Sequence, residues 1–121
     1  MMTKFPDGII LHITPLDDWL QALEAGVYRA DSLSSEGFMH CSQPEQVLQV
    51  ANTWFRSKSG LVLLCIDSSL VAAPIRDENL EGGEDRFPHI YGSLNLDAVH
   101  QVVNFPPGPD GLFELPWELS G

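Results

Sequence analysis

Three histidines in short motifs carry most of the reactive chemistry of this chain. They are His12 in Ile-Leu-His-Ile-Thr, His40 in Gly-Phe-Met-His-Cys-Ser and His89 in Phe-Pro-His-Ile-Tyr-Gly. An imidazole can donate a proton, accept one or bind a metal near neutral pH. Each motif adjoins an apolar, strand-like run, so we expect the three rings to converge on one pocket as its catalytic groups.

A polar side chain follows each histidine at a distance of two residues. These side chains are Thr14, Ser42 and Tyr91. Residues two apart in a strand point to the same face, so each is expected beside its histidine as a ligand-binding group. Arg29 and Arg86 are the candidate contacts for a ligand phosphate. The polar segment 79–86 contains Arg86 and Glu84, and is interpreted as a lid.

Length and composition bound the class of protein. The 121 residues, 44% of them hydrophobic, predict one domain over 1–121 with a core from about 8 to 115. A net charge of -11 disfavours nucleic acid and anionic membranes as partners. No apolar run approaches the ~20 residues of a membrane span, and the N-terminus lacks a secretory signal pattern. The only cysteines, Cys41 and Cys65, lie in apolar sequence. A cytoplasmic setting is therefore expected.

Strands and helices are expected to alternate along the chain. Strands are predicted at 8–13, 38–41, 61–66, 87–91 and 99–105, with a brief extension at 74–78 and a hairpin strand at 113–115. The run at 61–66 is continuously apolar, which predicts a central strand covered on both faces. Together these elements predict an α+β fold, in which two main helices pack on a small, bent and mixed β-sheet.

Two segments carry helix signals. Thr14 is the expected cap of a first helix that ends at Gly26, with Leu16, Leu20 and Leu23 on one face and Trp19 alongside. A second helix is expected after Ser42-Gln43-Pro44-Glu45, which matches a capping box, and it should end near 59–60. Its apolar positions at helical spacing are Val47, Val50, Ala51 and Trp54.

The longer motifs resemble a known family. The resemblance rests on Gly37-Phe38-Met39-His40-Cys41-Ser42, Gln46-Val47 and Phe87-Pro88-His89-Ile90-Tyr91-Gly92, preceded by Trp19, Ala22, Gly26 and Tyr28. Over residues 9–105 the chain is similar to a bacterial domain-of-unknown-function family. Its members are often loosely labelled glutathione S-transferase-related, a label that this sequence does not support. The resemblance implies a fold like that of ADP-ribosyltransferases and RNA 2′-phosphotransferase, with a bent, split sheet and an NAD-type cleft.

Roles for the motif residues follow from that resemblance. It implies that His12 contacts the nicotinamide ribose, with Thr14 completing a His-x-Thr pattern, and that His40 with Ser42 lines the nicotinamide pocket. The third position is usually glutamate in the transferases, whereas this sequence offers His89 and Tyr91. That departure disfavours classical mono-ADP-ribosylation. The expected function is binding of NAD or a related small nucleotide-like ligand, with glycosyl or phospho transfer as the implied chemistry.

Two other classes of function are open on the same residues. The units His12/Thr14 and His40/Ser42 imitate two-histidine phosphoesterases, in which one imidazole acts as base and the other as acid. A non-enzymatic module that binds a small ligand or a metal is the other. No close ligand spacing supports a metal site, so no metal ligands are assigned.

Overall fold

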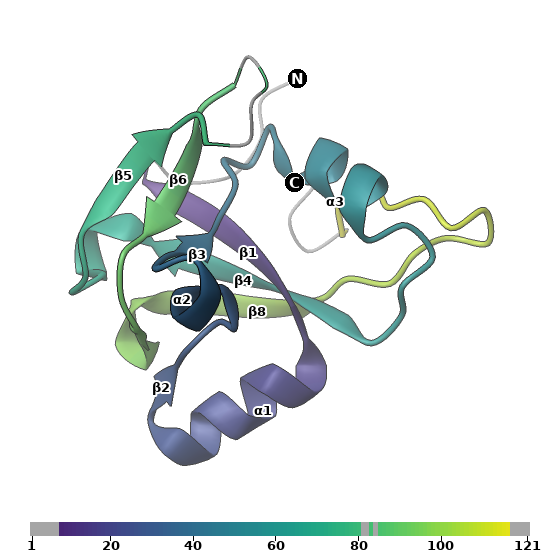
Figure 1. The fold of residues 1–121 in the computed structure, drawn as a ribbon. Coiled ribbons are helices and arrows are strands. Elements are labelled where there is room, and N and C mark those ends of the chain that lie inside the picture. Colours follow the sequence, from purple (N-terminus) through teal and green to yellow (C-terminus); the bar gives the residue numbers. More distant parts are fainter. Residues whose placement is uncertain (1–7, 81–82, 84, 117–121) are drawn as a thin grey trace.

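The described strands form three small antiparallel sheets. The computed structural model describes residues 8–80, 83 and 85–116 (Figure 1). One sheet has the order β1 (Ile9–Pro15), β4 (Leu61–Asp67), β8 (Val99–Asn104). A second has the order β3 (Met39–His40), β6 (Phe87–Ile90), β5 (Ile75–Glu78), and β2 (Val27–Tyr28) pairs with β7 (Leu94–Asn95). The helices are α1 (Leu16–Ala25), α2 (Ser32–Ser35) and α3 (Val47–Trp54), with 3-10 turns η1 (Ser68–Leu70) and η2 (Leu96–Ala98).

The α+β class is confirmed, but the mixed pairing predicted for the sheet is wrong. Every pairing between the described strands is antiparallel. A continuous apolar run indicates that both faces of a strand are buried, but it does not indicate the direction of the strand relative to its neighbours. The short pairs β2–β7 and β3–β6 also lie below the length at which a two-residue alternation is visible in sequence.

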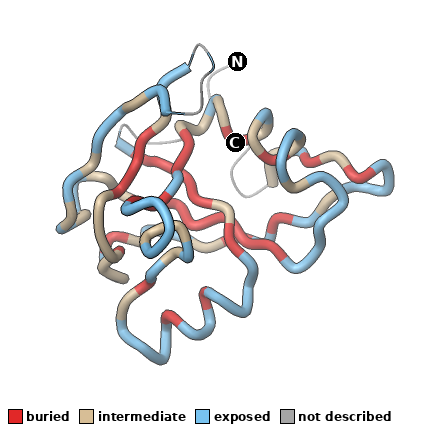
Figure 2. The backbone as a smooth tube through the Cα atoms, in the orientation of Figure 1, coloured by how far each residue is buried: buried red, intermediate tan, exposed pale blue. Residues whose placement is uncertain are grey.

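β4 is the central strand, as predicted, and it separates two hydrophobic cores. Its residues 61–66 are all buried, which Figure 2 shows as continuous red through the middle of the molecule. Successive side chains of a strand point to opposite faces. Val62, Leu64 and Ile66 accordingly pack in one core, and the second core contains Leu61, Leu63 and Cys65. α1 adjoins the first core through Trp19, and α3 adjoins the second through Val47 and Ala51.

One bridge connects the two larger sheets. The backbone N–H of Leu11 in β1 donates to Ser42 O, and the N–H of Ser42 donates back to Leu11 O, each at 2.8 Å. The preceding residue pairs the other way, since Cys41 N donates to Pro88 O at 3.0 Å. The chain at 41–42 therefore switches from β6 to β1, and we call residues 40–42 the junction segment.

Both predicted helix caps are wrong, because their side chains and backbones have other partners. Pro15 is the N-cap of α1 and makes no side-chain cap bond, while the Thr14 hydroxyl lies against Tyr28. α3 begins at Val47, since Ser42 is extended in its bridge to β1. The predicted stop at Gly26 is confirmed, with a left-handed φ of 79° and its N–H donating to Ala22 O.

The segment after β8 does not form the predicted hairpin. Phe113 N donates to Asn52 Oδ1 at 2.6 Å, and Asn52 Nδ2 donates to Phe113 O at 3.4 Å. The Phe113 ring stacks on Phe105 with centroids 4.7 Å apart. Residues 105–116 thus run as an irregular strap beside α3 (Figure 1). The side chain of Asn52 replaces a strand partner, which apolar patterning does not reveal.

The core face of α1 differs from the predicted one. Leu16, Leu20 and Leu23 are 39%, 47% and 53% exposed, while Trp19 and Ala22 are buried. Most of α1 is therefore pale blue in Figure 2. Trp19 and Ala22, three positions apart, are the residues of α1 that pack in the first core, so the leucine stripe faces outward.

This assignment predicts effects of very different size for two neighbouring substitutions. Trp19→Ala removes a buried indole and should lower the free energy of unfolding by about 3–5 kcal/mol. Leu20→Ala removes a half-exposed side chain and should change it by less than about 0.5 kcal/mol. Urea denaturation followed by circular dichroism measures both. Equal losses, or a larger loss for Leu20→Ala, would contradict the orientation of α1.

Candidate functional site

A cavity lies beside the junction segment, between β1 and α3. Its volume is about 470 Å³. Its walls come from residues 11–13 of β1, from the junction segment 40–42, from Val50, Trp54 and Phe55 at the end of α3, and from Ser32 and Phe87. Leu11, Ile13 and Val50 make the interior apolar, and hydroxyl and imidazole groups are placed among them. This composition is typical of small-molecule sites.

His12 occupies the cavity wall with both ring nitrogens bonded to the protein. Nδ1 lies 2.6 Å from His40 O, and Nε2 lies 2.8 Å from the Tyr28 hydroxyl. That hydroxyl is in turn 2.9 Å from Thr14 Oγ1. His12 and Thr14 therefore share a face, as their spacing predicts, and they share one partner on β2.

Burial keeps the His12 ring neutral. Desolvation lowers its pKa from 6.5 to about 4, although the bond to the His40 carbonyl acts in the opposite direction. A neutral imidazole carries one proton, and the carbonyl can only accept, so that proton is on Nδ1. Nε2 then accepts from the Tyr28 hydroxyl, which also lies within hydrogen-bond distance of Thr14 Oγ1. Because both nitrogens are used in this way, His12 fixes the shape of the wall and holds no spare proton for a ligand.

His40 presents the exposed imidazole of the cavity. Its side chain is 44% exposed, and its Nε2 lies 3.2 Å from both carboxylate oxygens of Glu36. The Phe38 ring stands edge-on to it at 5.1 Å between centroids. His40 is therefore the motif histidine best placed to meet a ligand while paired with a carboxylate.

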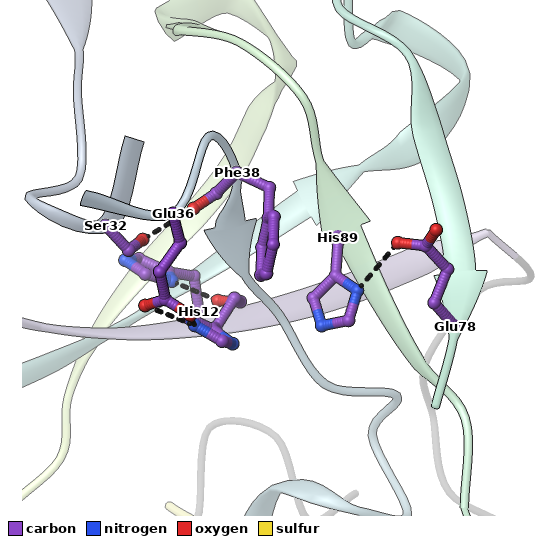
Figure 3. Close-up of polar contacts among 7 residues, drawn as sticks. His12, Ser32, Glu36, Phe38, Glu78 and His89 are labelled. Atoms are coloured by element: carbon purple, nitrogen blue, oxygen red, sulfur yellow. Dashed lines mark hydrogen bonds and ion pairs between the residues drawn. The ribbon is translucent and has the colours of Figure 1, made fainter. Parts of the chain in front are cut away.

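His89 lies behind this wall and does not line the cavity. It is fully buried, and its Nδ1 lies 3.2 Å from Glu78 Oε1. Figure 3 shows its ring between Phe38 and Glu78. The ring centroid is 4.5 Å from that of Phe38 and 5.4 Å from that of His40. The three histidines thus gather in one region of the fold, but only His12 and His40 reach the cavity.

Tyr91 and Glu78 complete this inner cluster. The Tyr91 hydroxyl donates to Glu78 Oε1 at 2.5 Å, and this bond holds the pKa of the carboxyl below its usual value. His89 and Tyr91 therefore point the same way, as predicted, and meet one acceptor on β5. The Arg76 guanidinium lies 5.0 Å over the Tyr91 ring.

The other predicted ligand-binding residues are scattered. Ser42 lines the cavity, whereas Thr14 is buried behind Tyr28 and does not. Arg29 is exposed and donates to Ser93 Oγ at 3.1 Å, away from the lining residues. Arg86 is exposed next to Phe87, and its carbonyl accepts from Gln46 Nε2 at 2.8 Å. Glu84, predicted as part of the lid, lies outside the described residues.

Sequence reasoning missed several residues of the site. Glu36 and Ser32 come from residues 27–37, for which the sequence predicts an irregular connection. The spacing of four between Glu36 and His40 is nevertheless a recognisable pairing distance. Ser32 Oγ donates to Phe38 O at 2.7 Å, which anchors the segment that presents His40 (Figure 3). Trp54 shares the helical spacing of Val47, Val50 and Ala51, and the sequence predicts it as a core or surface-packing residue, but it is 71% exposed at the cavity.

Comparison with known proteins places the chain in a family. Residues 13–102 match the family model described as "Protein of unknown function (DUF952)". The chain belongs to this family. The resemblance to a domain-of-unknown-function family is therefore confirmed, and the likeness to ADP-ribosyltransferases stays a prediction. No curated protein matches the chain significantly.

Solved structures agree on the fold. The crystal structure of protein CC0527 from Caulobacter crescentus is 30% identical, with a TM-score of 0.80, over 88% of this chain and 94% of that one. The solution structure of CC0527 is 28% identical, with a TM-score of 0.75, over 93% and 97%. Among the described residues, no helix is long and apolar enough to cross a membrane.

The contacts of His12 and the grouping of metal-ligating side chains test the two alternative functions, a phosphoesterase and a binding module. A two-histidine phosphoesterase needs two imidazoles that exchange protons with substrate, and both nitrogens of His12 are bonded within the protein. Within residues 8–80, 83 and 85–116, no group of three or more His, Cys, Asp and Glu side chains could hold a metal ion. The arrangement therefore supports neither the phosphoesterase nor a metal-binding module, and a non-enzymatic module for a small ligand stays open.

The neutral state of His12 predicts a dependence of stability on pH. In the unfolded chain the His12 ring takes up a proton near pH 6.5, whereas in the folded protein it does so only near pH 4. Between these values the unfolded state binds more protons, so the free energy of unfolding falls as pH falls. The contribution of His12 is about 3 kcal/mol across this window.

Urea denaturation at pH 7 and pH 4.5 measures this effect. His12→Gln lacks the titrating group and should lose this part of the pH dependence, while His100→Gln, at an exposed histidine of β8, should keep it. The same pH dependence in all three proteins would contradict the assignment of His12 as a buried neutral ring.

Proposed function

We propose that the cavity binds NAD or a related ribose-phosphate ligand, in the manner of ADP-ribosyltransferase-like proteins. The observation that carries the proposal is the position of the cavity, where the β1 sheet and the β3 sheet separate after their single bridge at Leu11 and Ser42. A ligand cleft in a split, bent sheet is what the family resemblance implies. The volume of about 470 Å³ falls in the range of roughly 300–1,000 Å³ that small-molecule sites have.

The lining suits a ligand with one flat apolar end and several hydroxyls. Leu11, Ile13 and Val50 offer apolar contacts to a nicotinamide-type ring. His40 and Ser32 supply groups that hydrogen-bond to ribose hydroxyls, and both lie on the side of the cavity formed by residues 32–42. A small number of polar groups among apolar ones fixes the orientation of such a ligand.

The histidines take different roles under this proposal. His40 contacts the ligand, and Glu36 holds its ring in place. His12 is a positioning residue, because its Nδ1–H fixes the carbonyl of His40 and so the backbone that presents the imidazole. His89 and Tyr91 support the far side through Glu78, without reaching the cavity.

Glycosyl-bond cleavage is the reaction that this arrangement favours. Departure of a nicotinamide-type base leaves positive charge on the ribose ring, and a nearby carboxylate stabilises such a charge. Glu36 supplies such a carboxylate, because it is bonded to His40 in the cavity wall. The ribose end is then attacked by water or another nucleophile, whose proton passes to solvent.

Calorimetric titration with NAD tests the proposal. We expect wild-type protein to bind NAD, and His40→Ala to weaken binding by about 10-fold through loss of one hydrogen bond. His100→Ala is the matched control at an exposed histidine outside the cavity, and it should bind as wild type does. The absence of binding at millimolar NAD and ADP-ribose, or equal affinities in all three proteins, would reject it.

A further inference from the structure

The mouth of the cavity is aromatic. Trp54 lines the cavity and is still 71% exposed, so its indole stands at the rim. Phe55 and Phe87, both half-buried, line the same cavity. A large indole left in water loses the stabilisation that burial would give it. A flat partner that stacks on it would recover this, since aromatic faces stack well on planar bases.

Three basic residues lie close in sequence to the aromatic residues of the mouth, in an otherwise acidic protein. The chain carries 6 basic residues against 17 acidic ones. Arg56, Lys58 and Arg86 all lie within three positions of Phe55 or Phe87, and all three are exposed. The Lys58 ammonium lies 5.6 Å from the centroid of the Phe55 ring, which places its charge beside the aromatic rim.

The rim is also held in position. Asn52, two residues before Trp54, exchanges two hydrogen bonds with the backbone of Phe113 in the strap. Ser57, in the turn between Arg56 and Lys58, donates its N–H to Gly111 O at 2.9 Å. The end of α3 and the basic turn after it are thus fixed to the strap, and a fixed site loses less entropy on binding.

We propose that this mouth is a subsite for an adenosine diphosphate group, with Trp54 stacking on the base and Arg56, Lys58 and Arg86 meeting the phosphates. It rests on the proposed function, because it places the second half of a dinucleotide outside the cavity that takes the first half. A stacking ring next to cations matches a base joined to phosphates. An apolar chain would use the indole but would leave the three cations without a role.

Three ligands and two variants at Trp54 test the subsite. NAD and ADP contain the adenosine diphosphate group, and nicotinamide mononucleotide lacks the adenosine. By calorimetry, Trp54→Ala should weaken NAD and ADP binding by about 10-fold to 100-fold, the loss expected for one stacked base. Affinity for nicotinamide mononucleotide should not change. Trp54→Phe should keep most of the affinity, and Leu20→Ala is the control at another exposed apolar helix residue.

Salt dependence tests the cations. The double variant Arg56→Gln/Lys58→Gln should bind ADP several-fold more weakly, with a smaller loss on going from low to high salt, because screening acts on exposed charges. Arg29→Gln removes one charge from an exposed arginine that does not line the cavity, and should bind ADP with the affinity and salt dependence of wild type.

Each outcome decides between the two proposals. If Trp54→Ala binds NAD and ADP as wild type does, or weakens all three ligands equally, the subsite is wrong and the proposed function stands. Binding of ADP that depends on Trp54, without any binding of NAD or nicotinamide mononucleotide, supports the subsite and rejects the proposed function. No binding of any of the three ligands to wild-type protein rejects both.

Discussion

The packing of the two larger sheets depends on one buried imidazole. The His12 ring joins β1 to the carbonyl of His40 on one side and to the Tyr28 hydroxyl of β2 on the other. A buried polar group without a partner costs about 1–3 kcal/mol, so each of these groups is stable only while the others stay in place. The ring therefore ties β1, β2 and β3 into a single arrangement, which apolar contacts alone do not specify.

The cavity follows from that arrangement. Because the junction segment turns from β6 to β1 within two residues, the sheets meet at Leu11 and Ser42 and then separate. β4 separates the two hydrophobic cores on its two faces, and α3 covers the second core with Val47 and Ala51 packed inward. The bridge between Leu11 and Ser42 holds His12 in a buried position and leaves His40 exposed at the cavity. One backbone contact therefore fixes both a structural histidine and an accessible one.

Local sequence signals were sufficient for the main elements but not for their faces. Apolar runs located β1, β4, β6 and β8, and Gly26 located the end of α1. The orientation of α1 was missed, because Leu16, Leu20 and Leu23 make a regular stripe, whereas the buried residues of the helix are Trp19 and Ala22. Side-chain partners decided the other differences, since Tyr28 engages Thr14 and Asn52 engages the strap.

For the site, spacing correctly paired His12 with Thr14 and His89 with Tyr91. It could not show that His12 and His89 are buried, because burial depends on long-range packing.

The two parts of the cavity differ in what supports them. Most of the inner part, with the junction segment, α3 and Phe87, falls within the matched family range 13–102, and Leu11 and His12 of β1 precede it. The rim depends in addition on the strap, where Gly111 and Phe113 lie beyond that range and hold the end of α3. A change in the strap therefore moves Trp54 and the basic turn without disturbing His12 or the bridge. Because substrate selection needs rigid placement of its contacts, the strap is the part of the structure through which the rim can change independently of the inner pocket.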